Sequence, residues 1–156
     1  MTKIEKLKKW ISESERIVFF GGAGVSTESG IPDFRGNGGL YGEETYFGER
    51  PETILSGTYL RKHPENFYEY YREHMLYPAA KPNDAHRILA KWEKEGRLSA
   101  VVTQNIDGLH QMAGSKNVLE LHGSVLRNYC TRCGKEFDFT RVAKGEGLPI
   151  CDVCGD

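Results

Sequence analysis

Residues 16–26 read RIVFFGGAGVS, a short β-branched and aromatic run followed at once by glycines. The run from Arg16 to Phe20 predicts a buried strand. The glycines predict a tight turn whose backbone can closely approach a phosphate, and the N-terminus of a following helix would favour the anion. The turn is neither a complete G-x-G-x-x-G, because Thr27 replaces the last glycine, nor a P-loop. A tight turn without a ligand therefore stays open as an interpretation.

The segments around this turn fit a parallel α/β sheet. The spacing of Ile4, Leu7 and Ile11 predicts an amphipathic first helix. Asn83 or Asp84 is expected to cap a later helix, whose buried face would carry Ile88, Leu89 and Trp92. The other expected elements are aromatic helical segments within 51–77, strands at 98–103 and 118–121, and a glycine-rich loop at 36–48. The order predicts a Rossmann-type parallel sheet, whose ligands bind beyond the carboxyl ends of the strands.

Composition narrows the class of protein. The chain has 156 residues, which suits one domain or one domain with a small appendage. Hydrophobic residues make up 38% and aromatic residues 11%, which indicates a globular rather than a disordered chain. The net charge of -1 gives no support for binding to nucleic acid or to a membrane surface. The apolar run 17–20 is far too short to span a bilayer, and we expect a cytoplasmic protein with neither partner.

Four cysteines form two CxxC pairs near the end of the sequence. Cys130 and Cys133 are separated from Cys151 and Cys154 by seventeen residues, a spacing typical of a zinc ribbon. Four thiolates would fill a tetrahedral shell, so one zinc ion would be structural. Two disulfides or a redox CxxC are alternatives, although the first is disfavoured in a cytosolic chain and the second by the repeated motif. A zinc ribbon is also a common nucleic-acid module, which the neutral charge disfavours.

Further polar clusters follow the predicted strands. Residues 30–36 read GIPDFRG and combine an acid, an aromatic ring and a guanidinium, which alone would also suit a surface turn with a salt bridge. Residues 103–110 read TQNIDGLH, and these polar side chains are placed either to contact a substrate or to cap a short helix. His122 closes the third strand, where a histidine serves as a general base or as an ordinary structural residue.

Taken together, these motifs resemble the sirtuin family of NAD-dependent protein deacylases. The resemblance rests on Gly22 to Ser26, GIPDFRG, TQNIDGLH, His122-Gly123 and the paired CxxC, in the family's order and over essentially the whole chain. It implies a Rossmann-type large domain and a small domain made of a zinc ribbon and a helical module, with the active site between them. The implied domains are 1–37 with 82–123 for NAD binding, 38–81 for the cofactor loop and helical module, and 124–156 for a truncated zinc ribbon.

The resemblance also assigns roles to residues. His122 would be the catalytic base, assisted by Asn105. The implied NAD contacts are Gly22, Ala23, Gly24 and Ser26 at the pyrophosphate, Asp33, Phe34 and Arg35 in the cofactor loop, Gln104 at the ribose, and Asn105, Ile106 and Asp107 around the nicotinamide. The expected activity transfers the acetyl group of acetyl-lysine in proteins or peptides to ADP-ribose with release of nicotinamide.

Acyl preference is partly readable from the same resemblance. Family members that remove succinyl or malonyl groups carry a Tyr-x-x-Arg pair in the helical module. Here Tyr68 would match the tyrosine, but Tyr71 stands at the arginine position and Arg72 is one residue off. Tyr68 and Tyr71 are therefore candidates for the acyl pocket, and we expect an acetyl preference.

The sequence departs from the family pattern after the second CxxC. The family continues through further strands and helices that carry peptide and adenosine contacts, and those segments are absent here. We therefore expect an N-terminal fragment that alone binds NAD poorly and shows little or no turnover. Two other functions stay open: mono-ADP-ribosyl transfer or NAD hydrolysis at the same site, and a zinc-ribbon module that binds protein or nucleic acid.

Overall fold

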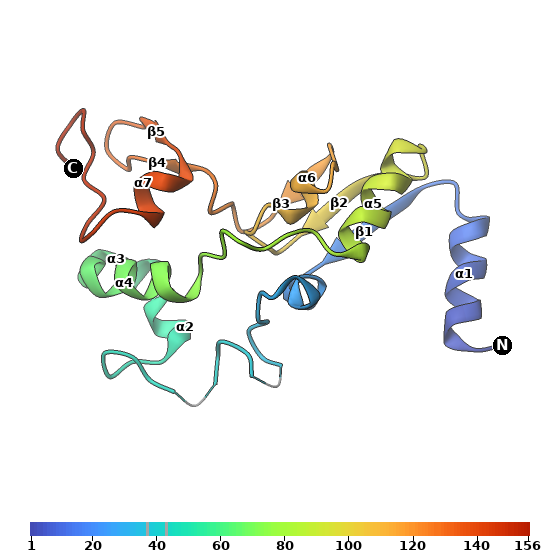
Figure 1. Ribbon diagram of the computed structural model, residues 1–156, viewed down its shortest axis with the longest axis horizontal. Coiled ribbons are helices and arrows are strands. Elements are labelled where there is room, and N and C mark those ends of the chain that lie inside the picture. Colours follow the sequence, from blue (N-terminus) through green and yellow to red (C-terminus); the bar gives the residue numbers. More distant parts are fainter. Residues whose placement is uncertain (37, 43) are drawn as a thin grey trace.

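A sheet of three parallel strands forms the centre of the larger part of the molecule in the computed structural model, which describes residues 1–36, 38–42 and 44–156 (Figure 1). Strands β1 (Ile17–Gly21), β2 (Leu98–Thr103) and β3 (Val118–Glu120) lie in that order. Gly21 is in register with Thr103, and Thr103 with Glu120. The predicted parallel sheet is confirmed, and its three carboxyl ends lie level with one another.

Helix α5 (Asp84–Lys94) covers one face of this sheet (Figure 1). Its Leu89 packs with Leu98 and Val101, both buried in the strand beneath. Asn83 is the N-cap, one of the two residues predicted for that role. The predicted buried face was partly wrong, because Ile88 is 39% exposed whereas His86 is fully buried. His86 lies three residues before Leu89 and so on the same face, while Ile88 is turned about 100° away.

The turn after β1 differs from the prediction, which placed an α-helix there. It consists of two short 3-10 helices, η1 (Ala23–Val25) and η2 (Thr27–Ser29). Gly30 ends the second with a φ of 83°, in the left-handed region that favours glycine. Serine and threonine are weak helix formers because their side chains bond elsewhere, which explains why no regular helix forms.

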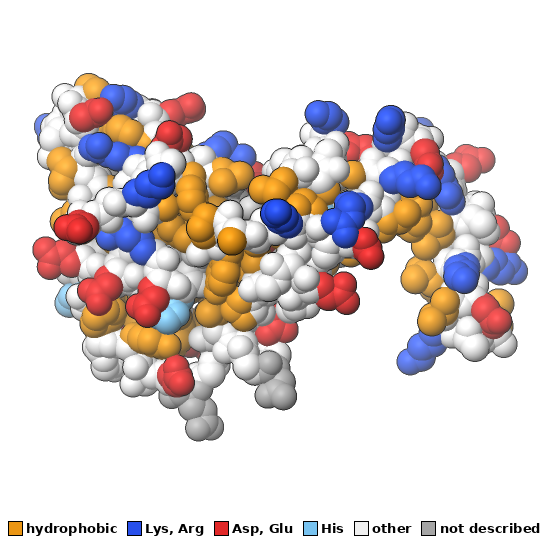
Figure 2. All heavy atoms as spheres, viewed as in Figure 1, with side chains coloured by type: hydrophobic (Ala, Val, Ile, Leu, Met, Phe, Trp, Pro, Cys, Tyr) orange, Lys and Arg blue, Asp and Glu red, His pale blue; other side chains and the backbone are white. Residues whose placement is uncertain are grey.

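Helix α1 (Lys3–Glu13) forms as predicted, with a capping box between Thr2 and Glu5. Its apolar Ile4, Leu7 and Trp10 are exposed, and Figure 2 shows apolar side chains on the side of α1 that faces the rest of the molecule. Within the described ranges, no helix has the length and hydropathy needed to cross a bilayer.

The helical module comprises α2 (Pro51–Ile54), α3 (Gly57–Lys62) and α4 (Pro64–His74). The buried side chains of Ile54, Tyr59 and Tyr70 form its own core, against which Phe67 packs. The preceding segment, 36–48, contains no helix or multi-residue strand among its described residues, in agreement with the predicted loop. The predicted domain boundary at residue 37 lies outside the described residues.

The last part of the chain contains short strands β4 (Asn128–Tyr129) and β5 (Glu136–Phe137), which pair antiparallel, and helix α7 (Phe139–Ala143). It lies beside the helical module in Figure 1. Arg72 of α4 joins the two, because its guanidinium donates hydrogen bonds to the carbonyl oxygens of Val142 at 2.7 Å and Gly147 at 2.5 Å. The short helix α6 (Leu109–Met112) lies between β2 and β3 in the chain.

Candidate active site

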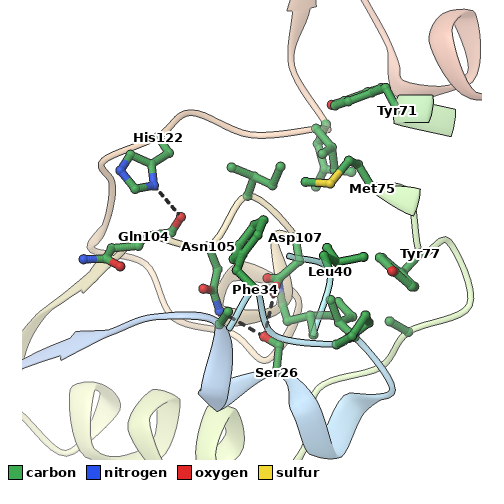
Figure 3. A pocket seen from close by; sticks show the side chains of 18 of the residues that line it. Ser26, Phe34, Leu40, Tyr71, Met75, Tyr77, Gln104, Asn105, Asp107 and His122 are labelled. Atoms are coloured by element: carbon green, nitrogen blue, oxygen red, sulfur yellow. Dashed lines mark hydrogen bonds between the residues drawn. The ribbon is translucent and has the colours of Figure 1, made fainter. Parts of the chain in front are cut away.

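The level ends of the three strands bring the polar motifs together around one cavity. Its volume is about 560 Å³, and its walls come from the turn after β1, residues within 31–34 and 40–41, the helical module and the segments after β2 and β3 (Figure 3). Among the predicted site residues, the lining includes Ala23, Ser26, Phe34, Tyr71, Gln104, Asn105, Ile106, Asp107 and His122. Motifs far apart in the sequence thus share one site.

Ser26 is the centre of a polar cluster at the floor of the cavity (Figure 3). Its hydroxyl donates to Oδ2 of Asp107 at 2.6 Å and accepts from Nδ2 of Asn105 at 3.0 Å. Ser26 is only 1% exposed, and Asn105 is also buried. Oδ1 of Asp107 accepts from the Leu109 amide at 2.9 Å. Asp107 therefore bonds to the first turn of α6 and faces the cavity cluster with its other oxygen.

His122 lies on the opposite side of the site, where it is exposed to solvent (Figure 3). Its Nδ1 is 3.0 Å from the backbone carbonyl oxygen of Gln104. A carbonyl oxygen only accepts hydrogen bonds, so Nδ1 carries the hydrogen and the neutral ring keeps its lone pair on Nε2. The Gln104 amide in turn donates to the Gly21 carbonyl at 3.0 Å. The geometry leaves Nε2 free to accept a proton.

The glycine turn allows close contact with this segment. A Cβ added at Gly22 would lie 3.2 Å from Oε1 of Gln104, tighter than most real contacts. A Cβ added at Gly24 would meet nothing within 4 Å, so the backbone there faces open space. A side chain at Gly22 would need only a small shift of the flexible Gln104 side chain, whereas Gly24 leaves room for another molecule.

The segment GIPDFRG forms a wall of the site and a smaller adjoining cavity of about 370 Å³ lined by Asp33, Phe34, Arg35 and His122, among others. Oδ1 of Asp33 accepts from the Gly36 amide at 2.7 Å, and no ion pair joins Asp33 to Arg35. A salt bridge is therefore not observed between the acid and the guanidinium of this segment, both of which the structure describes. The ring of Phe34 instead packs 4.9 Å from that of Tyr41.

The helical module supplies the apolar end of the main cavity. Tyr71 lines it beside Met75 and Tyr77, and burial raises the pKa of Tyr71 to about 12, which keeps its hydroxyl neutral. Tyr68 lies outside the lining, with its ring edge-on to Phe67 at 5.3 Å. The hydrogen bonds of Arg72 to two backbone carbonyls hold its guanidinium in the contact between the module and the last part of the chain.

Sequence reasoning missed a pair of buried histidines next to the polar cluster. The rings of His86 and His110 lie 4.7 Å apart, and both side chains are almost completely buried. Burial lowers the pKa of His110 to about 4, so the ring is neutral at physiological pH. His110 belongs to the motif TQNIDGLH, but the pattern alone gave it no role.

The four cysteines converge as the spacing predicted. Their sulfur atoms all lie within 4.8 Å of one another, with Cys130 and Cys154 at 3.5 Å and Cys133 and Cys151 at 3.7 Å. All four are free thiols, so the alternative of two disulfides is not observed. Zn–S bonds of about 2.3 Å place the sulfurs of a tetrahedral site about 3.8 Å apart. The donor set and its spacing fit one zinc ion.

Both CxxC turns have the same backbone design. The Gly134 amide donates to the Cys130 carbonyl at 3.0 Å, and the Gly155 amide donates to the Cys151 carbonyl at the same distance. Both glycines have positive φ, 74° and 73°. Backbone amides also point at the sulfur atoms of Cys130 and Cys151, which lowers the pKa of each thiol. The turns are arranged for thiolate ligands.

A family model and relatives similar in sequence point to the same family. The family model described as "Sir2 family" matches residues 22–156. A Clostridium acetobutylicum protein named NAD-dependent protein deacetylase is 60% identical over 156 residues, which cover 99% of this chain and 64% of that protein. A Clostridium perfringens protein of the same name is 56% identical over 153 residues, covering 98% and 63%. The chain thus spans less than two thirds of the length of these relatives.

Solved structures agree in fold. A Sir2 variant with a deacetylated peptide and 3'-O-acetyl ADP ribose matches with a TM-score of 0.86 and 41% identity, covering 99% of this chain and 62% of that one. A structure from work on the mechanism and regulation of Sir2 enzymes matches with a TM-score of 0.83 and 40% identity, covering 99% and 60%.

Proposed function

The chain belongs to the Sir2 family, and from that premise we propose that the protein is an NAD-dependent protein-lysine deacetylase. The observation that carries the proposal is the placement of His122 across one cavity from the Ser26, Asn105 and Asp107 cluster. A general base on one side and a buried amide and carboxylate on the other suit a reaction at a ribose that carries a nicotinamide.

We propose that NAD binds along the carboxyl ends of the strands, as ligands do in parallel α/β sheets. When bound there, NAD would supply a ribose carbon that can lose nicotinamide and form a bond to the acetyl carbonyl oxygen of the substrate. Gly22, Ala23, Gly24 and Ser26 would hold the pyrophosphate, and the open space at Gly24 supports this. The other proposed contacts are Asp33, Phe34 and Arg35 in the loop, Gln104 at the ribose, and Asn105, Ile106 and Asp107 at the nicotinamide.

Asp107 and Asn105 would orient the nicotinamide carboxamide. A carboxylate only accepts hydrogen bonds, and each oxygen of Asp107 has a second lone pair beyond the partner it already has. Such an oxygen suits the carboxamide NH2 group. The hydroxyl of Ser26 holds both side chains in place, which fixes the cluster before the substrate arrives.

His122 would accept a proton from a ribose hydroxyl through Nε2. The Gln104 carbonyl fixes the ring with its Nδ1 hydrogen, so the lone pair of Nε2 is available without rearrangement. The ring faces solvent, which provides a route for the proton to leave. General-base assistance of this kind is typically worth about 10²–10⁴ in rate.

An acetyl preference follows from the apolar end of the cavity. Tyr71, Met75 and Tyr77 present no free positive charge to a succinyl or malonyl carboxylate. Arg72 is bonded to the carbonyls of Val142 and Gly147 and would have to leave them to reach an acyl group. We propose Tyr71 as an acyl-pocket residue; Tyr68, which does not line the cavity, has weaker support.

We also propose the type of fold, the metal site and the cellular location. The three-stranded sheet would be the first part of a Rossmann-type fold, and the cysteine cluster would hold one structural zinc in a ribbon. The cytoplasm is the proposed location, because its reducing conditions suit four cysteines that would bind zinc as thiolates.

The test is nicotinamide release by the full-length product of the gene that encodes this chain. We expect release from NAD that depends on an acetyl-lysine peptide and fails with the unacetylated peptide. Release that ignores the acetyl group would point to NAD hydrolysis or ADP-ribosyl transfer. No release with any acetylated peptide, from folded protein that contains zinc, would refute the proposal.

A further inference from the structure

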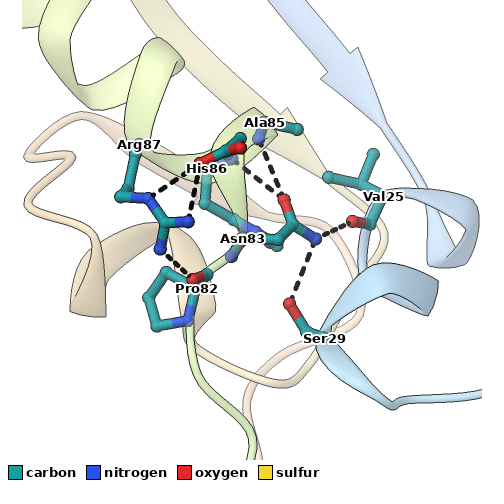
Figure 4. A network of polar contacts seen from close by, with 8 residues as sticks. Val25, Ser29, Pro82, Asn83, Ala85, His86 and Arg87 are labelled. Atoms are coloured by element: carbon teal, nitrogen blue, oxygen red, sulfur yellow. Dashed lines mark hydrogen bonds and ion pairs between the residues drawn. The ribbon is translucent and has the colours of Figure 1, made fainter.

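The side chain of Asn83 joins two segments that are far apart in the sequence (Figure 4). Its Oδ1 accepts hydrogen bonds from the amides of Ala85 at 3.0 Å and His86 at 3.4 Å, which caps helix α5. Its Nδ2 donates to the Val25 carbonyl at 2.7 Å and to the Ser29 hydroxyl at 3.1 Å. Every polar atom of this almost completely buried amide is used.

Capping alone does not explain an asparagine at this position. Serine, threonine, aspartate and asparagine cap helices with similar strength, because the cap needs only an oxygen acceptor. Of the four, only asparagine also carries two N–H donors. Both donors point away from the helix that Asn83 caps, toward the turn after β1 (Figure 4). The side chain therefore does a second task that the helix does not require.

That second task acts on the segment that contains Ser26. The two acceptors of Asn83, Val25 and Ser29, flank Ser26 on either side in the chain. The segment itself consists of single 3-10 turns, whose hydrogen bonds have poorer geometry than those of an α-helix. Ser26 is held from the cavity side by Asn105 and Asp107, and its flanks are held from the other side by Asn83.

We propose that Asn83 is a positioning residue of the site, which holds the turn of residues 22–30 against α5 and so fixes Ser26 and the backbone that would meet the pyrophosphate. The inference rests on the proposed NAD site for its functional part. Its structural part, the attachment of the turn to α5, stands on the hydrogen bonds alone.

Two variants separate the attachment from the cap. Asn83→Ser keeps an oxygen for the cap but is too short to reach the turn, and it adds no charge. Asn83→Asp keeps the shape and the cap but removes both donors. Agreement between the two excludes an effect of the added charge. Thr2→Ala, which removes the cap of the distant helix α1, is the matched control.

The first measurement is amide hydrogen exchange of the folded protein, with and without NAD. Each lost hydrogen bond of this kind changes a local opening equilibrium roughly two- to twelvefold. We expect exchange in residues 23–31 to rise at least about fivefold in both Asn83 variants, while residues 87–94 of α5 exchange as in wild type. In the Thr2→Ala control, residues 23–31 should also exchange as in wild type. Unchanged exchange in 23–31 would overturn the proposal.

The second measurement is steady-state kinetics of the full-length gene product. We expect KM for NAD to rise at least about fivefold in both variants, with KM for the acetyl peptide and kcat changed less than about twofold. A fall in kcat of about fivefold or more, with an unchanged KM for NAD, would contradict the positioning role. A folded wild-type full-length gene product in which NAD neither binds nor protects residues 23–31 would instead refute the proposed function, and faster exchange in the variants would still support the attachment.

Discussion

Removing the hydroxyl of Ser26 tests the polar cluster most simply. Ser26→Ala deletes one hydrogen bond to a carboxylate, at 2.6 Å, and one from an amide, at 3.0 Å, in a site that is 1% exposed. A hydrogen bond to a charged group is worth about 1.5–3 kcal/mol, and a neutral one about 0.5–1.5 kcal/mol. The expected loss in free energy of unfolding is therefore about 2–4 kcal/mol.

The assay is urea and thermal unfolding of wild type and variant. For a chain of this length, each kcal/mol lowers Tm by about 2–4 °C, so we expect a fall of about 4–16 °C. Ser12→Ala is the control, because the Ser12 hydroxyl bonds only to the exposed Lys9 carbonyl of α1. Its expected change is within about 0.5 kcal/mol.

A double-mutant cycle tests whether the loss of stability comes from the contact between Ser26 and Asp107. Combined with Asp107→Ala, the Ser26→Ala change should be non-additive by about 1 kcal/mol or more, because the two side chains are in direct contact. A Ser26→Ala variant as stable as Ser12→Ala, or a fully additive cycle, would refute the reasoning that this cluster is a pre-formed, interdependent unit.

Other predictions concern the base, the metal, the buried histidine and the acyl group. His122→Ala should lower deacetylation by about 10²–10⁴ while isotope exchange of free nicotinamide into NAD persists; equal loss of both reactions would contradict a base that acts after nicotinamide leaves. Wild type should contain one zinc per chain by elemental analysis, and Cys133→Ser should lose most of it and unfold residues 128–156; a zinc-free chain with native exchange there would be inconsistent with a structural metal. Burial, and next the neighbouring His86, lowers the pKa of His110 to about 4, so the contribution of this residue to stability is complete above about pH 6.5 and falls by up to about 3 kcal/mol toward pH 4. His110→Leu should flatten that fall in denaturant titrations, and an unchanged pH slope would count against a buried neutral ring. Acetyl-lysine peptide should react at least about tenfold faster than succinyl-lysine peptide, since an unpaired carboxylate in an apolar pocket is costly; equal rates would disprove the acyl assignment.

Much of the fold was predictable because it depends on local pattern. The strand before the glycine turn and the strand at 98–103 are short β-branched runs, and both form. The prediction that the first strand is buried was wrong for one of its faces, because Val18 and Phe20 are 59% and 62% exposed. The helix expected after the glycine turn was wrong, because the chain forms only two 3-10 turns there and Gly30 ends the second with a positive φ. Ile88 was wrongly assigned to the buried face. It is adjacent to Leu89 in the sequence, but one residue corresponds to a rotation of about 100° around the helix.

The candidate site was predictable in its residues but not in its contacts. The resemblance named Ser26, Asn105 and Asp107 separately, as NAD contacts. Their mutual hydrogen bonds, across about 80 positions, depend on the register of β1 with β2, which no local pattern specifies. The hydrogen on Nδ1 of His122 likewise depends on where the Gln104 carbonyl points.

We propose that this site transfers an acetyl group from lysine to ADP-ribose. The most direct measurement is mass spectrometry of the products when the full-length gene product is given NAD and an acetyl-lysine peptide. We expect free lysine peptide, nicotinamide and O-acetyl-ADP-ribose in equal amounts, with one water consumed. Free acetate formed without NAD consumption, or a peptide that carries ADP-ribose with its acetyl group intact, would contradict it.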